Sequence, residues 1–196
     1  GNARQVNPSV PGKAGSMSRF VINNEHLYIV NPLELKVFDL SSCENPNLVN
    51  TKILELNGGE AEMVSVLNNL LLVGSNIGVL LYDTESPDDP AFLSQFDHVQ
   101  ACDPVVGKDN FAFVTLRDGR GEDCGFNFTN QLDVLDISEP RNPFLLSSFT
   151  MINPHGLGID GNLLFVADGS AGLKVFDAAD PARVGMNVIA AFGTFR

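Results

Sequence analysis

Four ionisable side chains stand at matching places in four repeated stretches of this sequence. Aligned on the turn that follows each expected first strand, the matching residues are Arg19, Glu62, Asp103 and His155. Such a set could bind an anion, a small polar ligand, or a metal ion held by Asp103, Glu62 and His155. The structural alternative is a ring of ion pairs around a water-filled channel. A shift of one residue in the alignment would turn these side chains to the other side of their strands.

A polar, glycine-rich insertion at 116–131 separates two expected strands of the third repeat. Loops of this length and composition are where recognition usually occurs. Phe126 and Phe128 inside it are therefore candidate ligand contacts, with packing onto their own repeat as the structural alternative.

Two of the three cysteines, Cys102 and Cys124, lie in loops that we expect at one end of the third repeat. Neighbouring loops can bring two Cα atoms within disulfide distance, so we predict a bridge between them, with Cys43 unpaired. A bridge fits an oxidising compartment. The enzymatic alternative pairs one of these cysteines with His155 as a nucleophile, but no third orienting group is evident.

The repeat itself sets the architecture that must position these residues. Each repeat holds an apolar run, an aspartate and a turn rich in Ser, Pro and Asp, and the aspartates are Asp39, Asp83, Asp136 and Asp177. A period of roughly 40–45 residues made of short strands is typical of β-propeller blades. We predict an all-β β-propeller of four-stranded antiparallel blades. Four blades are visible, and they either close a ring or form part of a larger wheel. We assign the aspartates to the turns, where a carboxylate accepts backbone N–H groups.

The last repeat shows the expected blade most clearly. Its predicted strands are 155–159, 163–168, 173–178 and 186–192. The four blades are placed at about 17–58, 59–99, 100–152 and 153–196. Residues 1–16, rich in Pro, Gly, Ser and Asn, are expected to form a flexible arm or tether before the propeller domain at 17–196.

Strand order fixes which loops lie together. The loop leading into a blade's first strand lies at the same end as the loop between its second and third strands. We call this end the upper face and the opposite end the lower face. First strands line the channel of a propeller, so the four ionisable residues would surround its upper mouth, and the insertion would lie over it.

Composition excludes several classes of function. The net charge of −12, from 24 acidic and 12 basic residues, disfavours nucleic acid as a partner. No apolar run approaches the ~20 residues of a membrane helix, so we expect a soluble body that reaches a membrane only through a tether at its N-terminus. Calcium-loop, dinucleotide and zinc-protease motifs are missing, and we assign no cofactor and no metal. His26 and His98 are expected to be isolated surface residues.

The repeats resemble the LVIVD-repeat family of bacterial β-propellers. The resemblance covers about residues 17–192 and is carried by LFVADGSAGLKVFDAADP, AFVTLRDGRGEDCGFNFTNQLDVLDISEPRNP and LYIVNPLELKVFDLSSCENP. It implies a propeller fold in an exported or surface-anchored protein of lipoprotein type. The resemblance supplies no catalytic signature.

Two functions remain open from the sequence. The first is a non-enzymatic binding or scaffold module of the bacterial cell envelope, at the cell surface or in the periplasm, with or without a lipid anchor. Its partner would be an envelope protein, a glycan or a small polar ligand, recognised at the channel mouth and the insertion. The second is an extracytoplasmic hydrolase or lyase with Asp103, Glu62 and His155 as acid/base groups. A carboxylate with a strongly shifted pKa in a deep pocket would favour the enzyme.

Overall fold

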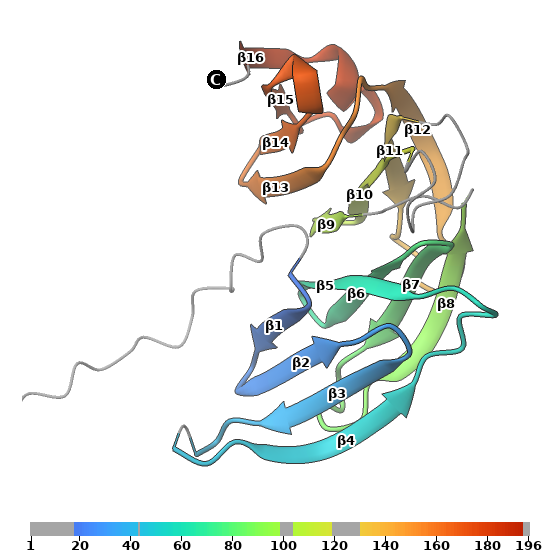
Figure 1. Cartoon of the computed structure of the whole chain (residues 1–196), viewed down its shortest axis with the longest axis vertical. Helices are drawn as coiled ribbons and strands as arrows, with labels where there is room; N and C mark the ends of the chain where they lie inside the picture. Colours follow the sequence, from blue (N-terminus) through green and yellow to red (C-terminus); the bar gives the residue numbers. More distant parts are fainter. Residues whose placement is uncertain (1–17, 43, 99–103, 119–129, 194–196) are drawn as a thin grey trace, which may run out of the picture.

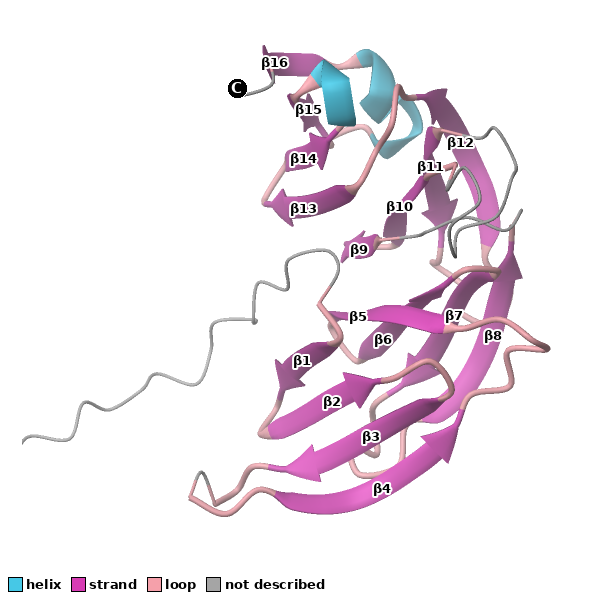
Figure 2. Cartoon of the chain, in the orientation of Figure 1, coloured by secondary structure: helices cyan, strands magenta, loops and turns pink. Residues whose placement is uncertain are grey.

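The fold is an open array of four antiparallel sheets. A computed structural model of the chain describes residues 18–42, 44–98, 104–118 and 130–193. Within these ranges sixteen strands form four sheets of four, and within each sheet neighbouring strands are consecutive along the chain (Figures 1 and 2). The prediction of an all-β propeller with four-stranded antiparallel blades is confirmed.

The four blades have the following strands. Blade 1 holds β1 (Phe20–Asn23), β2 (His26–Val30), β3 (Glu34–Asp39) and β4 (Asn47–Ile53). Blade 2 holds β5 (Ala61–Leu67), β6 (Leu70–Ser75), β7 (Gly78–Asp83) and β8 (Ala91–Asp97). Blade 3 holds β9 (Val105–Lys108), β10 (Phe111–Leu116), β11 (Gln131–Asp136) and β12 (Phe144–Thr150). Blade 4 holds β13 (Gly156–Asp160), β14 (Leu163–Ala167), β15 (Leu173–Asp177) and β16 (Val188–Phe192).

Two short 3₁₀ helices lie in blade 4, η1 (Gly169–Ala171) and η2 (Pro181–Met186). The last strand was expected to begin at 186, but β16 begins at Val188. Proline at the first position of η2 favours a helical turn, and the Asn187 N–H closes that turn on the Val184 carbonyl at 3.0 Å. Within the described ranges no helix is long and apolar enough to cross a bilayer.

The hairpins between the first and second strands share one feature in all four blades, and blade 1 adds a second positive φ, at Glu25. The first residue of each turn has a positive φ, and these residues are Asn24, Asn68, Asp109 and Gly161. Glycine adopts this conformation freely, and Asn and Asp tolerate it better than other side chains. The turns therefore fix the start of each second strand.

The aspartate after each third strand closes the next turn. In all four blades its Oδ1 accepts the backbone N–H of the residue two positions on, at distances of 2.7 to 2.9 Å. The structural role assigned to Asp39, Asp83, Asp136 and Asp177 is confirmed.

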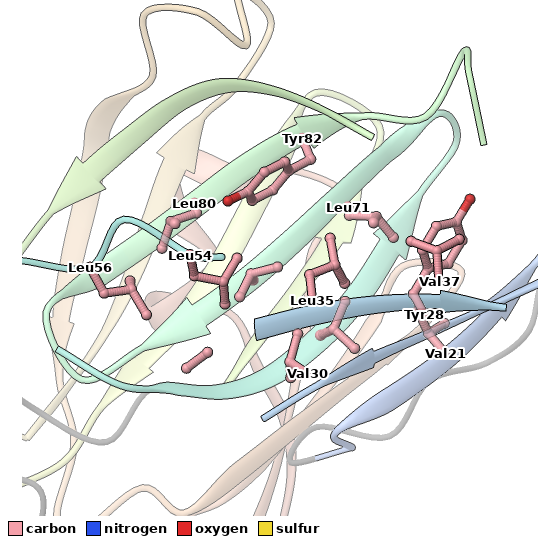
Figure 3. Close-up of a cluster of buried hydrophobic side chains, with 13 residues drawn as sticks. Val21, Tyr28, Val30, Leu35, Val37, Leu54, Leu56, Leu71, Leu80 and Tyr82 are labelled. Atoms are coloured by element: carbon pink, nitrogen blue, oxygen red, sulfur yellow. The ribbon is translucent and has the colours of Figure 1, made fainter. Parts of the chain in front are cut away.

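Three hydrophobic clusters join consecutive blades. Figure 3 shows the first, in which Tyr28 and Val37 of blade 1 face Leu71 and Tyr82 of blade 2. Equivalent clusters join blade 2 to blade 3 and blade 3 to blade 4, and none among the described residues joins blade 1 to blade 4. Figure 1 shows these two blades at opposite ends of an open arc, with β1, β5, β9 and β13 along its inner side.

Candidate functional site

The described candidates lie at the upper ends of three inner strands. Arg19 immediately precedes β1 and His155 immediately precedes β13, and both are exposed, whereas Glu62 lies half-buried within β5. Asp103, Phe126, Phe128, Cys102 and Cys124 lie outside the described residues. The ring of four ionisable groups, the aromatic contacts and the disulfide therefore remain predictions.

The hydrogen-bonding register shows that Arg19 and His155 are offset by one residue when the first strands of blades 1 and 4 are compared. The Arg19 carbonyl accepts the N–H of Val30, the last residue of β2, at 2.8 Å. In blade 4 the last residue of the second strand is Ala167. It pairs with Gly156, the residue after His155. The two side chains therefore do not occupy equivalent positions, as expected from an alignment error of one residue.

Glu62 departs from the regular register for a different reason. The pairing of β5 with β6 shifts between Ala61 and Met63, so Glu62 is the extra residue of a β-bulge. A bulge twists the strand and re-aims the side chain it carries. No alternation of residue types reveals such a bulge in advance.

His155 belongs to a polar group formed by blades 3 and 4. Its Nε2 lies 3.2 Å from the Asn153 Nδ2. Partial burial, followed by the positive charge of Arg117, lowers the pKa of His155 below its usual value. The imidazole is therefore neutral at neutral pH. With Nε2 accepting from the Asn153 amide, the ring proton resides on Nδ1. We call Arg117, Asn153 and His155 the upper-face group.

Asp168 holds the loop that carries two members of this group. This side chain is fully buried, and its Oδ1 accepts the N–H groups of Ile152 and Asn153, each at 2.8 Å. Its Oδ2 accepts a hydrogen bond from the Lys174 ammonium at 2.6 Å. The carboxylate is thus fully engaged in fixing the connection from β12 to β13, which sets the position of His155.

Sequence reasoning missed Asp168, although a weak signal was present. In blade 1, the equivalent residue after the second strand is Asn31, whose Oδ1 accepts the N–H groups of Leu33 and Glu34 at 3.0 and 2.9 Å. A polar residue directly after an apolar second strand therefore marks a local anchor of the upper face. In blade 4 that anchor is an aspartate with a lysine on the next strand.

A second buried carboxylate, Asp133, lies on β11. It accepts hydrogen bonds from the Gln131 amide at 2.8 and 3.0 Å and from the Ser148 hydroxyl at 2.5 Å. These donors come from the same blade, so Asp133 ties β11 to β12. Within the described ranges, His, Cys, Asp and Glu side chains nowhere gather in a group of three that could hold a metal ion.

The interpretation of His26 as an isolated surface residue is wrong. Its Nε2 lies 2.7 Å from the Asp88 Oδ1, and its Nδ1 lies 2.8 Å from the Asn24 carbonyl. Asp88 belongs to the loop between β7 and β8, so this contact joins blade 1 to blade 2 at the lower face.

Comparison with known families supports the repeat assignment. Residues 127–151 and 155–189 each match the LVIVD repeat. These two segments of the chain are LVIVD repeats. These two matches cover the end of blade 3 and most of blade 4. No curated protein matches the chain in sequence.

Solved structures show the same fold at low identity. A Lactobacillus plantarum protein shares 16% identity over 87% of this chain and 55% of its own, with a TM-score of 0.66. The periplasmic gluconolactonase PpgL of Pseudomonas aeruginosa shares 13% over 86% and 54%, with a TM-score of 0.65. BamB from Moraxella catarrhalis shares 9% over 91% and 49%, with a TM-score of 0.61. This chain thus spans about half the length of each of these three proteins.

Proposed function

We propose that this LVIVD-repeat chain is a non-enzymatic binding module whose recognition surface is the upper face of blades 3 and 4. The observation that carries the proposal is the upper-face group, in which Asn153 and His155 of the blade 3–4 connection lie near Arg117. The Asp168 anchor holds this connection in place before any partner binds. Such preorganisation lowers the entropic cost of binding.

The chemistry of the group suits a partner rich in oxygen atoms. A neutral imidazole with its proton on Nδ1 can donate a hydrogen bond to a hydroxyl or carboxylate oxygen. The Arg117 guanidinium favours a carboxylate in the same place. We therefore propose a polar partner of the cell envelope, either a glycan bearing carboxylates or a protein loop. The periplasmic location of PpgL supports an extracytoplasmic site of action.

The second candidate is an extracytoplasmic hydrolase or lyase that uses Asp103, Glu62 and His155. PpgL, a gluconolactonase, is the similar structure that favours it. Against it, the carboxylate most deeply buried beside the upper-face group, Asp168, is already bound by two N–H groups and an ammonium. A carboxylate held in this way serves as an anchor and is poorly placed to transfer protons.

Isothermal titration calorimetry of the chain with carboxylate-bearing envelope glycan fragments tests the proposal. We expect Arg117→Ala and His155→Ala each to weaken binding by roughly tenfold, the loss typical of one charge-assisted hydrogen bond. Arg141→Ala is the matched control. Arg141 is an exposed arginine of the same blade, in the loop between β11 and β12 at the lower face, and its removal should leave the affinity unchanged.

Two results would contradict the binding module. Equal losses in Arg117→Ala and Arg141→Ala would show that overall charge, rather than the upper face, controls binding. Turnover of lactone or glycan substrates that disappears in His155→Ala would instead support the enzyme.

A further inference from the structure

The residue directly after the second strand is an anchor in three of the four blades. In blade 1 it is Asn31, and in blade 2 it is Asn76, whose Oδ1 accepts the N–H of Glu60 at 2.8 Å. In blade 4 it is Asp168, which holds the connection from β12 to β13. In blade 3 the same position holds Arg117, and a guanidinium has no acceptor atom. Arg117 therefore cannot anchor a loop as the other three residues do, and its role depends on what it faces.

Arg117 faces blade 4 at the upper end of the junction between blades 3 and 4. Side chains alternate along a strand, so Arg117, which extends β10 by one bridged residue, lies on the same side as Phe113. Phe113 and Leu157 of β13 are buried in the same hydrophobic cluster between the two blades. His155 lies two residues before Leu157, and the positive charge of Arg117 acts on its ring. The two side chains therefore lie near each other above this cluster.

The charged groups around His155 determine when its ring takes a proton. Within the described ranges, the neighbouring elements bring Arg117 and Asp118 of blade 3 and the Asp168–Lys174 pair of blade 4 to this end of the junction. The charges of the pair offset each other. Partial burial and the positive charge of Arg117 both lower the pKa of His155, so the ring is neutral in the free chain at neutral pH. A bound carboxylate would offset the charge of Arg117 and favour the protonated ring.

Asn153 can serve as a partner for both states of the ring. In the neutral state its amide nitrogen donates to the His155 Nε2 across 3.2 Å. When a proton from the solvent binds Nε2, both ring nitrogens become donors. Rotation of the Asn153 amide by half a turn then presents its Oδ1 to the new N–H group. The protonated ring thus keeps this hydrogen bond, and its Nδ1–H remains available to a ligand.

We propose, on the basis of the function proposed above, that the upper-face group takes up one proton, on His155, when it binds a carboxylate, so that binding tightens as the pH falls. The additional affinity is complete below the pKa of His155 in the free chain. It is lost as the pH rises through the higher pKa of the bound state. A rise of one pKa unit on binding strengthens the complex about tenfold. The site therefore holds its partner most tightly in mildly acidic surroundings.

Proton uptake is measured by isothermal titration calorimetry of the chain with a hexuronate oligosaccharide in buffers of different ionisation enthalpy. At pH 6.5, the ordinary pKa of histidine, we expect net uptake on binding. The affinity should be about tenfold higher at about pH 5.5 than at about pH 8, a range in which the ligand carboxylates stay ionised. His155→Asn should bind with an affinity that no longer changes over this range. His26→Gln, which removes a half-buried histidine at the lower face, is the matched control and should keep the wild-type pH dependence.

Arg117→Asn tests the electrostatic coupling of the two side chains. Asparagine is the residue that blades 1 and 2 hold at this position, so the blade should accept it. Removal of the guanidinium should weaken binding at every pH. It should also raise the pKa of His155 in the free chain, which nuclear magnetic resonance of the ring protons measures, and so move the pH dependence of binding upward. An unchanged His155 pKa in this variant would contradict the coupling.

The possible results separate the proton coupling from the binding module. Hexuronate binding with no proton uptake and with one affinity over the whole pH range would overturn the coupling and leave the binding module in place. Failure to bind hexuronate at any pH would overturn the carboxylate site and the coupling with it. A pH dependence that persists in His155→Asn would assign the proton to another group and overturn the role of His155.

Discussion

At the scale of single residues, neighbours decide what an aspartate does. Asp177 sits at the end of a strand and accepts one N–H group of its own turn. Asp168 is buried between the end of one blade and the start of the next, and it accepts three hydrogen bonds. The first role follows from the sequence, because a turn aspartate acts on residues next to it. The second role depends on Lys174 and on the loop that connects blades 3 and 4. The fold brings both next to Asp168, and the sequence alone does not show that they meet.

This difference predicts unequal effects on stability. Asp168→Ala should lower the free energy of unfolding by about 3 kcal/mol, since it leaves two N–H groups and an ammonium without their shared acceptor. Asp177→Ala should cost about 1 kcal/mol, the usual contribution of one turn hydrogen bond. Urea unfolding followed by circular dichroism measures both. Equal losses in the two variants would show that Asp168 does not anchor the connection.

At the scale of strands and loops, the sequence predicts the elements but not all of their registers. Apolar runs and turn residues place the four blades, and the four strands of the last one, close to their observed positions, because period and turn chemistry are local properties. The bulge at Glu62 and the one-residue offset between Arg19 and His155 arise from pairing between strands. These features change the candidate site. Among the described residues the fold brings together the upper-face group, whereas the ring of four, which includes Asp103, remains a prediction.

A contact between loops of neighbouring blades makes stability depend on pH. Burial lowers the pKa of His26. Hydrogen bonds to the Asn24 carbonyl and Asp88, together with the charges of Asp88 and Asp39, raise the pKa by a larger amount, so the net pKa lies above 6.5. Because the folded pKa is the higher one, this stabilisation is fully present below pH 6.5 and is lost as the pH rises through the folded value.

The difference in unfolding free energy between the wild type and His26→Gln should therefore shrink as the pH is raised above 6.5. Thermal and urea unfolding of both proteins over a pH series measures this difference. Asp88→Asn is the companion variant, and it should weaken the same pH dependence by removing the carboxylate partner. A difference that stays constant with pH would show that His26 has the same pKa in the folded and unfolded chains.

At the scale of the whole molecule, the repeat predicts the blades but says little about how consecutive blades are arranged. The four-stranded blade is encoded four times, so the architecture was accessible from one sequence. The open arc has a different origin: it depends on the angle between consecutive blades, which is set by side-chain packing in the three clusters. Among the described residues, the apolar second and third strands of blades 2 and 3 are covered on both faces, whereas blades 1 and 4 each leave one face uncovered.

This asymmetry predicts how the array opens. A blade stacked on both sides is stabilised by two junctions and an end blade by one, so in the monomer β6 and β10 should exchange their amide hydrogens more slowly than β2 and β14. Hydrogen exchange followed by mass spectrometry measures the gradient. Uniform exchange across all four blades of the monomer would instead mean that the array unfolds as a single unit, with the end faces contributing nothing to local stability.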